Sequence, residues 1–180
     1  MRIKREHSLG LIIDIQEKLF PHMDQHEALL KRCTILIEGL KVLDIPLVIT
    51  EQYPKGLGAT VPEISALHEQ KPVIEKIAFS CCDEPALMQN AFMQSRDTVI
   101  ICGIEAHVCV LQTVIDLIEA GYQAVVVKDC ISSRKTEDKR VAVDRMRAEG
   151  AVISTSESIL FEIARVAGTE EFKAISRLIK

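Results

Sequence analysis

The sequence predicts an α/β protein: a three-layer sandwich in which helices flank a six-stranded parallel sheet. Three observations lead to this prediction. Short β-branched apolar runs recur along the whole chain, amphipathic stretches separate them, and the runs are continuous rather than alternating. Continuous apolar runs are typical of strands that are covered on both faces. Strands that alternate with helices favour right-handed crossovers within one sheet.

The predicted strands, in chain order, are residues 9–15, 46–50, 73–77, 98–104, 124–128 and 151–154. Apolar residues at helical spacing predict helices over 29–40 and 110–118, and Pro46 and Gly121 stand where these two helices should end. Residues 140–149, 157–166 and 170–179 complete the predicted helices. The segment 51–70, with Pro54, Gly56, Gly58 and Pro62, predicts a long irregular loop, a kind of segment that is usually functional.

The composition indicates one globular domain over residues 1–180. The chain is 48% hydrophobic and 27% charged, which is sufficient for a buried core. A net charge of −4 and an aromatic content of 4% without tryptophan argue against nucleic-acid binding. The N-terminus lacks a secretion signal, and no run approaches the ~20 apolar residues of a membrane span. We therefore expect a cytoplasmic protein that binds neither nucleic acid nor membranes.

Six cysteines are scattered along the chain. Without a secretion signal they are expected to be reduced thiols rather than a disulfide framework. The chain contains no C-x-x-C or H-E-x-x-H pattern, so the sequence predicts no metal site. We expect no cofactor, and a small molecule as the substrate.

Three residues that can do chemistry follow or end predicted strands. Asp14 ends the first strand, Lys76 lies in the third, and Cys109 follows the fourth. The carboxyl ends of parallel strands are the usual place for ligands. A buried Asp14 requires a counter-charge, which Lys76 offers. Taken singly, Asp14 could be a capping residue at a strand end and Lys76 a solvated lysine on an edge strand.

Cys109 lies in the first turn of a predicted helix. Free N–H groups and the positive end of the helix dipole lower the pKa of a thiol there and can bind an oxyanion. The alternative is a cysteine that packs as a small hydrophobe, and we accept that alternative for Cys33, Cys102 and Cys130. Cys109 differs from them, because its expected position beside Lys76 and Asp14 favours a thiolate.

Three motifs, in this order, resemble the isochorismatase-like cysteine hydrolases. They are Ile13-Asp14-Ile15-Gln16, Glu75-Lys76 and Gly103-Ile104-Glu105-Ala106-His107-Val108-Cys109-Val110. The segment 48–58, which reads Val-Ile-Thr-Glu-Gln-Tyr-Pro-Lys-Gly-Leu-Gly, is similar to that of the isochorismatase domain-containing proteins within this family. The resemblance covers about residues 8–156.

The resemblance implies a catalytic triad of Asp14, Lys76 and Cys109 on a six-stranded parallel sheet. It also implies a cis peptide bond between Ile104 and Glu105, and an oxyanion hole formed by the N–H groups of Glu105 and Cys109. Relatives that cleave the vinyl ether of isochorismate lack the cysteine. Its presence therefore implies cleavage of a C–N bond, in a small amide or carbamoyl-type substrate, through a thioester.

The chain departs from the family pattern in two places. Nicotinamidases of this family bind a metal through an Asp-x-His set and further histidines, whereas residues 51–54 here read Glu-Gln-Tyr-Pro. The resemblance thus implies neither a metal nor nicotinamidase activity. Leu19 stands where an aromatic residue is common, five residues after Asp14. The candidate substrate-binding residues are Gln16, Leu19, Gln52 and Phe79.

Two other functions are compatible with such a chain. One is a non-catalytic interaction protein that retains the hydrolase fold. The other is a nucleotide-binding domain, which is disfavoured because no G-x-G-x-x-G or P-loop follows a predicted strand. We also expect a homo-oligomer, because the last two helices present more apolar residues than one sheet face needs: Ile159, Leu160, Ile163, Ile175, Leu178 and Ile179.

Overall fold

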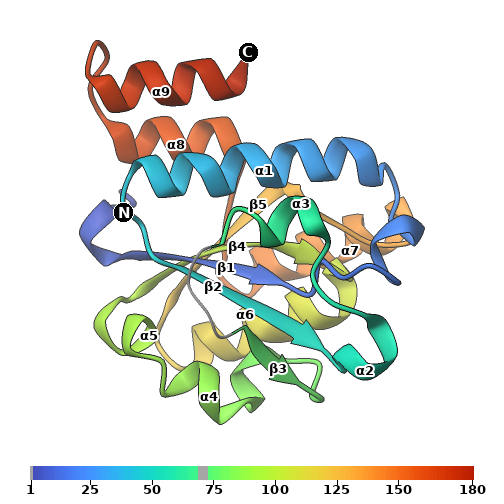
Figure 1. Ribbon diagram of the computed structural model, residues 1–180. Helices are drawn as coiled ribbons and strands as arrows, with labels where there is room; N and C mark the ends of the chain where they lie inside the picture. The colour runs from blue at the N-terminus through green and yellow to red at the C-terminus, as the bar shows by residue number, and fades with distance from the viewer. Residues whose placement is uncertain (1, 69–72) are drawn as a thin grey trace.

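The computed structural model describes residues 2–68 and 73–180, and in them the predicted sheet is present (Figure 1). Its six parallel strands have the order β3-β2-β1-β4-β5-β6. Their bounds are β1 Ser8–Ile13, β2 Leu47–Gln52, β3 Ile74–Lys76, β4 Thr98–Ile104, β5 Gln123–Ser132 and β6 Val152–Ser154. The fold class expected from the continuous apolar runs is confirmed.

Helices cover both faces of the sheet and make it the middle layer (Figure 1). One face packs against α1 (His26–Val42) and α8 (Ser156–Ala164), and α9 (Glu170–Ile179) packs on these two helices on the side away from the sheet (Figure 1). The other face packs against α4 (Pro85–Met88), α5 (Ala91–Ser95), α6 (Leu111–Glu119) and α7 (Thr136–Ala148). Each face therefore has its own apolar core. No helix of the described residues is long and apolar enough to cross a membrane.

The expectation of an irregular loop over 51–70 is wrong for its described part. Strand β2 extends to Gln52, and two short helices follow: α2 (Pro54–Leu57) and α3 (Pro62–Ser65). Each begins with a proline, whose missing N–H and fixed φ suit the first helical position. The expected loop end at residues 69 and 70 lies outside the described residues. Between the helices, Thr60 forms a β-bridge with Gln16, so the segment lies against the end of β1.

Strands β1 and β5 also end elsewhere than expected, and β3 ends one residue early, at Lys76. Strand β1 ends at Ile13, because Asp14 turns the chain with a φ of +54°. Strand β5 continues to Ser132, because its last residues pair with Gly103 and Ile104 beyond an irregularity in the ladder. Gly103 permits the close approach of β1 and β4: its φ is +149°, and a Cβ there would lie 2.3 Å from the carbonyl oxygen of Ile13. The two central strands thus end side by side.

Candidate active site

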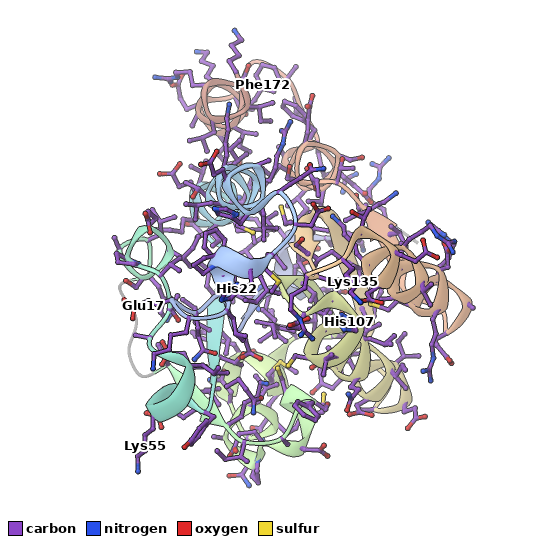
Figure 2. All side chains as sticks on the ribbon, turned by 90° about the vertical axis from the view of Figure 1, so that its right-hand side faces the viewer. Glu17, His22, Lys55, His107, Lys135 and Phe172 are labelled. Atoms are coloured by element: carbon purple, nitrogen blue, oxygen red, sulfur yellow. The ribbon has the colours of Figure 1, made fainter. Side chains whose placement is uncertain are left out.

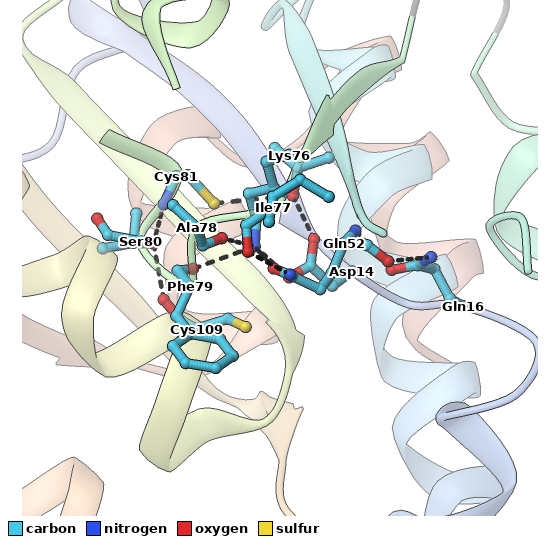
Figure 3. A network of polar contacts seen from close by, with 12 residues as sticks. Asp14, Gln16, Gln52, Lys76, Ile77, Ala78, Phe79, Ser80, Cys81 and Cys109 are labelled. Atoms are coloured by element: carbon cyan, nitrogen blue, oxygen red, sulfur yellow. Dashed lines mark hydrogen bonds and ion pairs between the residues drawn. The ribbon is translucent and has the colours of Figure 1, made fainter. Parts of the chain in front are cut away.

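Asp14 and Lys76 form a buried ion pair at the carboxyl edge of the sheet (Figure 3). Lys76 Nζ lies 2.7 Å from Asp14 Oδ2, and the two side chains are 0% and 1% exposed. Asp14 follows β1, and Lys76 is the last residue of β3. Two charges removed from water this completely are tolerated only as a pair. The expected counter-charge for Asp14 is therefore present.

Three further oxygens surround the Lys76 ammonium. Gln52 Oε1 accepts a hydrogen bond from it at 2.8 Å. The carbonyl oxygens of Ala78 and Phe79 accept at 3.2 and 3.1 Å. Burial is the largest single effect and would lower the pKa of Lys76, but Asp14, together with the smaller contributions of Cys81 and Cys109, outweighs it and the pKa is raised. Lys76 is thus a permanent cation at neutral pH.

Thr50 holds the other oxygen of the Asp14 carboxylate. Its hydroxyl donates to Asp14 Oδ1 at 2.8 Å and lies 3.7 Å from Cys81 Sγ. Thr50 is fully buried and stands opposite Ile13 in the β1–β2 ladder, one residue before Asp14. The two carboxylate oxygens are therefore fixed by different groups, Oδ1 by Thr50 and Oδ2 by Lys76.

Cys109 lies on a wide helical turn, Ala106–Val110, which connects β4 to α6. The turn begins at Glu105, whose φ is +53°. The Glu105 carbonyl accepts hydrogen bonds from the N–H groups of Val108 (2.9 Å) and Val110 (3.4 Å), the neighbours of Cys109 on either side. The Cys109 carbonyl accepts a hydrogen bond from the Thr113 hydroxyl at 2.7 Å. The thiol faces the Asp14–Lys76 pair (Figure 3).

The expected lowering of the Cys109 pKa is wrong. Burial and the negative charge of Asp14 raise the pKa of Cys109 far above its ordinary value, although Lys76 opposes them. The Asp14 carboxylate lies near enough to the thiol to favour the protonated sulfur. The partial positive charge at the helix end lowers the pKa of Cys109, whereas the full negative charge of Asp14 raises it and has the larger effect. At neutral pH Cys109 therefore holds its proton next to a carboxylate that can accept it.

The Glu105 side chain pairs with basic residues beside the site. Its Oε1 lies 2.7 Å from Arg134 Nε, and its Oε2 lies 3.4 Å from His107 Nδ1. His107 Nδ1 is also 3.0 Å from the Ser133 hydroxyl. Figure 2 is a view onto the carboxyl edge of the sheet, in which His107 is seen just below Lys135. The Glu105 charge is therefore already neutralised by the chain.

The four candidate substrate-binding residues have different surroundings. Gln16 is fully buried: its Nε2 donates to the carbonyls of Gln52 and Gly58, and its Oε1 accepts the Gln52 N–H. This geometry favours a structural role. Gln52 binds Lys76 through Oε1 and donates to the Ile77 carbonyl through Nε2 at 2.6 Å. Leu19 packs half-buried against the core, whereas Phe79 is 54% exposed and lies beside Cys109 in Figure 3.

Sequence reasoning missed three residues of this network: Thr50, Cys81 and Thr113. Thr113 joins two of the segments, because its hydroxyl accepts the Cys81 N–H at 2.9 Å and donates to the Cys109 carbonyl. Burial raises the pKa of Cys81 to about 11. Threonines are common in strands and helices whether or not their hydroxyls are used, so the register was needed to find them. In the described part of the chain, no three His, Cys, Asp or Glu side chains are grouped so that they could hold a metal ion.

Comparisons with known proteins agree with this architecture. The family described as "Isochorismatase domain" matches residues 8–158. Isochorismatase domain-containing protein 2A of Mus musculus is 39% identical, over 99% of this chain and 85% of that protein. The structure of a MAR1 ribonuclease from Caenorhabditis elegans is 37% identical with a TM-score of 0.92, over 99% and 92% of the two chains. The YcaC gene product of Escherichia coli, an octameric hydrolase of unknown specificity, shares the fold at 22% identity and a TM-score of 0.93, over 99% and 89%.

Proposed function

Because the chain belongs to the isochorismatase family, we propose that it is a cysteine hydrolase that cleaves a C–N bond of a small amide or carbamoyl-type substrate. The observation that supports this proposal most strongly is the buried Asp14–Lys76 ion pair against the Cys109 thiol. A nucleophile, a proton acceptor and a fixed cation meet there at one edge of the sheet. These are the parts that covalent acyl transfer requires.

In the proposed reaction the Cys109 sulfur attacks the substrate carbonyl while its proton passes to Asp14. The oxyanion formed accepts hydrogen bonds from the N–H groups of Glu105 and Cys109. Asp14 then gives the proton to the leaving nitrogen, the C–N bond breaks, and a thioester remains. Water attacks the thioester as Asp14 takes one of its protons. Collapse of this second intermediate releases the carboxylic acid, and the proton returns to sulfur.

A protonated resting thiol is consistent with this sequence of steps. Since the pKa of Cys109 is raised, attack has to be coupled to proton transfer, and Asp14 is the carboxylate whose charge acts on the thiol. Lys76 stabilises the ionised form of Asp14 between turnovers. Its hydrogen bonds to the Ala78 and Phe79 carbonyls hold the ammonium in place.

A screen of small amides and carbamoyl compounds with ammonia detection tests the proposal. We expect ammonia release by the wild type and by Cys82→Ser, and none by Cys109→Ser. Cys82 is the matched control, because it is a neighbouring thiol outside the triad. Since a relative is called a ribonuclease, RNA is included. RNA cleavage without amide cleavage would reject the C–N assignment, and no turnover of any compound would favour the non-catalytic interaction protein.

We also propose that the chain acts in the cytoplasm on a small molecule, as a homo-oligomer. The octameric assembly of the Escherichia coli protein supports the oligomer. Of the six apolar residues that led to this expectation, Ile159, Leu160, Ile163 and Ile175 are buried within the chain, so only Leu178 and Ile179 are left half-buried, together with Phe161.

A further inference from the structure

A second cavity lies at the carboxyl end of β5, between α1 and α7. Strand β6 pairs with Val125–Val127, and among the described residues no strand pairs with β5 beyond that point on this side. The ladder to β4 is also irregular: β4 advances two residues from Ile101 to Gly103, while β5 advances five, from Val126 to Ile131. The bulged segment lines a cavity of about 710 Å³. Cavities of this size hold small molecules.

The floor of this cavity is apolar. Leu29 of α1, Ile131 of β5 and Val143 of α7 line it and are 4%, 0% and 3% exposed. Ala28 stands on its rim, on the exposed side of α1. These side chains give the cavity an apolar base, against which an apolar body of a ligand can pack.

The carboxylates of the wall already have partners within the wall. Each of the four accepts a hydrogen bond there: Asp24 from Thr136, Asp129 from Ser156, and Glu137 and Asp144 from Arg140. Arg32 lies 4.0 Å from Asp129, and Arg147 pairs with Asp144 at 3.1 Å. The negative charge of the wall is thus largely satisfied.

Two lysines of the wall differ from these residues. Lys128 and Lys139 line the cavity, and neither forms an ion pair with any residue that the structure describes. Lys139 is half-buried, and burial together with the nearby Lys128 charge lowers its pKa. Lys128 is exposed, and the charges of Asp129 and Asp24 oppose the lowering at Lys139 without forming an ion pair with it. Both ammonium groups can therefore contact an anion in the cavity.

We propose that this cavity is a second ligand site, which binds a small organic anion with an apolar body and a carboxylate or sulfonate group. The apolar body lies on Leu29, Ile131 and Val143, and the anionic group contacts Lys128 and Lys139. The site is separate from the triad. None of Asp14, Lys76 and Cys109 is among the residues that line it.

The test uses anilinonaphthalene sulfonate, a fluorescent aromatic sulfonate, titrated into the full chain. We expect saturable binding to the wild type and to Cys109→Ser, since the triad takes no part. The double variant Lys128→Gln/Lys139→Gln should bind on the order of tenfold more weakly. The matched control Lys31→Gln/Lys135→Gln, two exposed lysines that do not line the cavity, should bind like the wild type. Ala28→Phe fills the cavity and should abolish binding.

Three results would overturn the proposal. The first is an absence of saturable binding to the wild type. The second is equal weakening in both lysine double variants, which would show attraction by general positive charge. The third is a change in molecular mass on Ala28→Phe, measured by light scattering, together with no dye binding to the wild type. That result would show that a second copy of the chain covers the cavity.

Discussion

Replacing Asp14 by asparagine should make Cys109 more reactive toward alkylation and at the same time abolish turnover. At an effective dielectric constant of about 20, two opposite charges 2.7 Å apart attract by ~6 kcal/mol. Asp14→Asn removes this attraction and leaves the Lys76 ammonium without its carboxylate. Cys109 then loses the charge that raises its pKa and keeps the charge that lowers it. The thiolate of Cys109, although still the minor form at pH 7, is then stabilised by the unpaired Lys76 ammonium.

The size of the effect follows from two opposing factors. Exchanging a nearby anion for an unpaired cation lowers a pKa by about 2, which increases the thiolate fraction at pH 7 about 100-fold. A less basic thiolate is a weaker nucleophile and loses about tenfold in rate over that interval. Alkylation of Cys109 by iodoacetamide should therefore be about tenfold faster in Asp14→Asn. Hydrolysis should fall by about 100-fold or more, because the proton acceptor is missing.

The assay is time-resolved mass spectrometry of the labelled peptides. Cys82 is an internal control, because burial, Cys81 and Asp116 raise its pKa to about 12, without a contribution from Asp14. Cys33 and Cys102 are fully buried and remain unlabelled only while the fold is intact. Lys76→Met should have the opposite effect on Cys109, about tenfold slower labelling, because the charge that lowers its pKa is lost.

Slower labelling of Cys109 in Asp14→Asn, with Cys82 unchanged and the buried thiols protected, would refute this reasoning. It would show that the carboxylate activates the thiol even toward a reagent that needs no general base. Equal rates in Asp14→Asn and Lys76→Met would also refute it, since the two charges are predicted to act in opposite directions.

Three further predictions concern the scaffold. Thr50→Val leaves a buried carboxylate oxygen without its donor and should lower the free energy of unfolding by about 2–3 kcal/mol in urea denaturation; Thr98→Val, whose hydroxyl bonds the exposed Asp97, should cost less than about 1 kcal/mol. Gly103→Ala should cost more than about 3 kcal/mol, because its Cβ meets backbone, whereas Gly121→Ala, with open space around it, should cost about 1–2 kcal/mol. Light scattering should give a mass well above that of one chain, 20.1 kDa; a mass equal to it would exclude the homo-oligomer.

The fold and the ion pair could be predicted from the sequence for one physical reason, the cost of burial. Continuous apolar runs can be strands only if both faces are covered, and a carboxylate at the end of such a run requires a cation. Lys76 is indeed at 2.7 Å from Asp14. The covered sheet and the cation beside Asp14 both follow from the free-energy cost of burial, and neither requires knowledge of the turns and strand register around the site.

The features that sequence reasoning missed depend on register and turn geometry. Thr50 reaches Asp14 because it pairs with Ile13 across β1 and β2, and nothing local to either segment indicates that pairing. The direction of the Cys109 pKa depends on the distance between the thiol and Asp14, which the wide turn at 106–110 determines. The cavity beside β5 arises from an irregular ladder between β4 and β5. Local sequence patterns do not determine any of these three.

The strand order has a consequence for how the chain matures as it is synthesised. Strand β1 is among the first elements made, but it lies between β2 and β4, so its second neighbour is available only after residue 104 has emerged. Until then Asp14 and Lys76 are hydrated side chains on an incomplete sheet with an open edge. The thiol of Cys109 is delivered by the same segment that closes this edge. In a nascent chain the Cys109 thiol therefore meets Asp14 and Lys76 only at the stage at which the central sheet is completed and shielded from water.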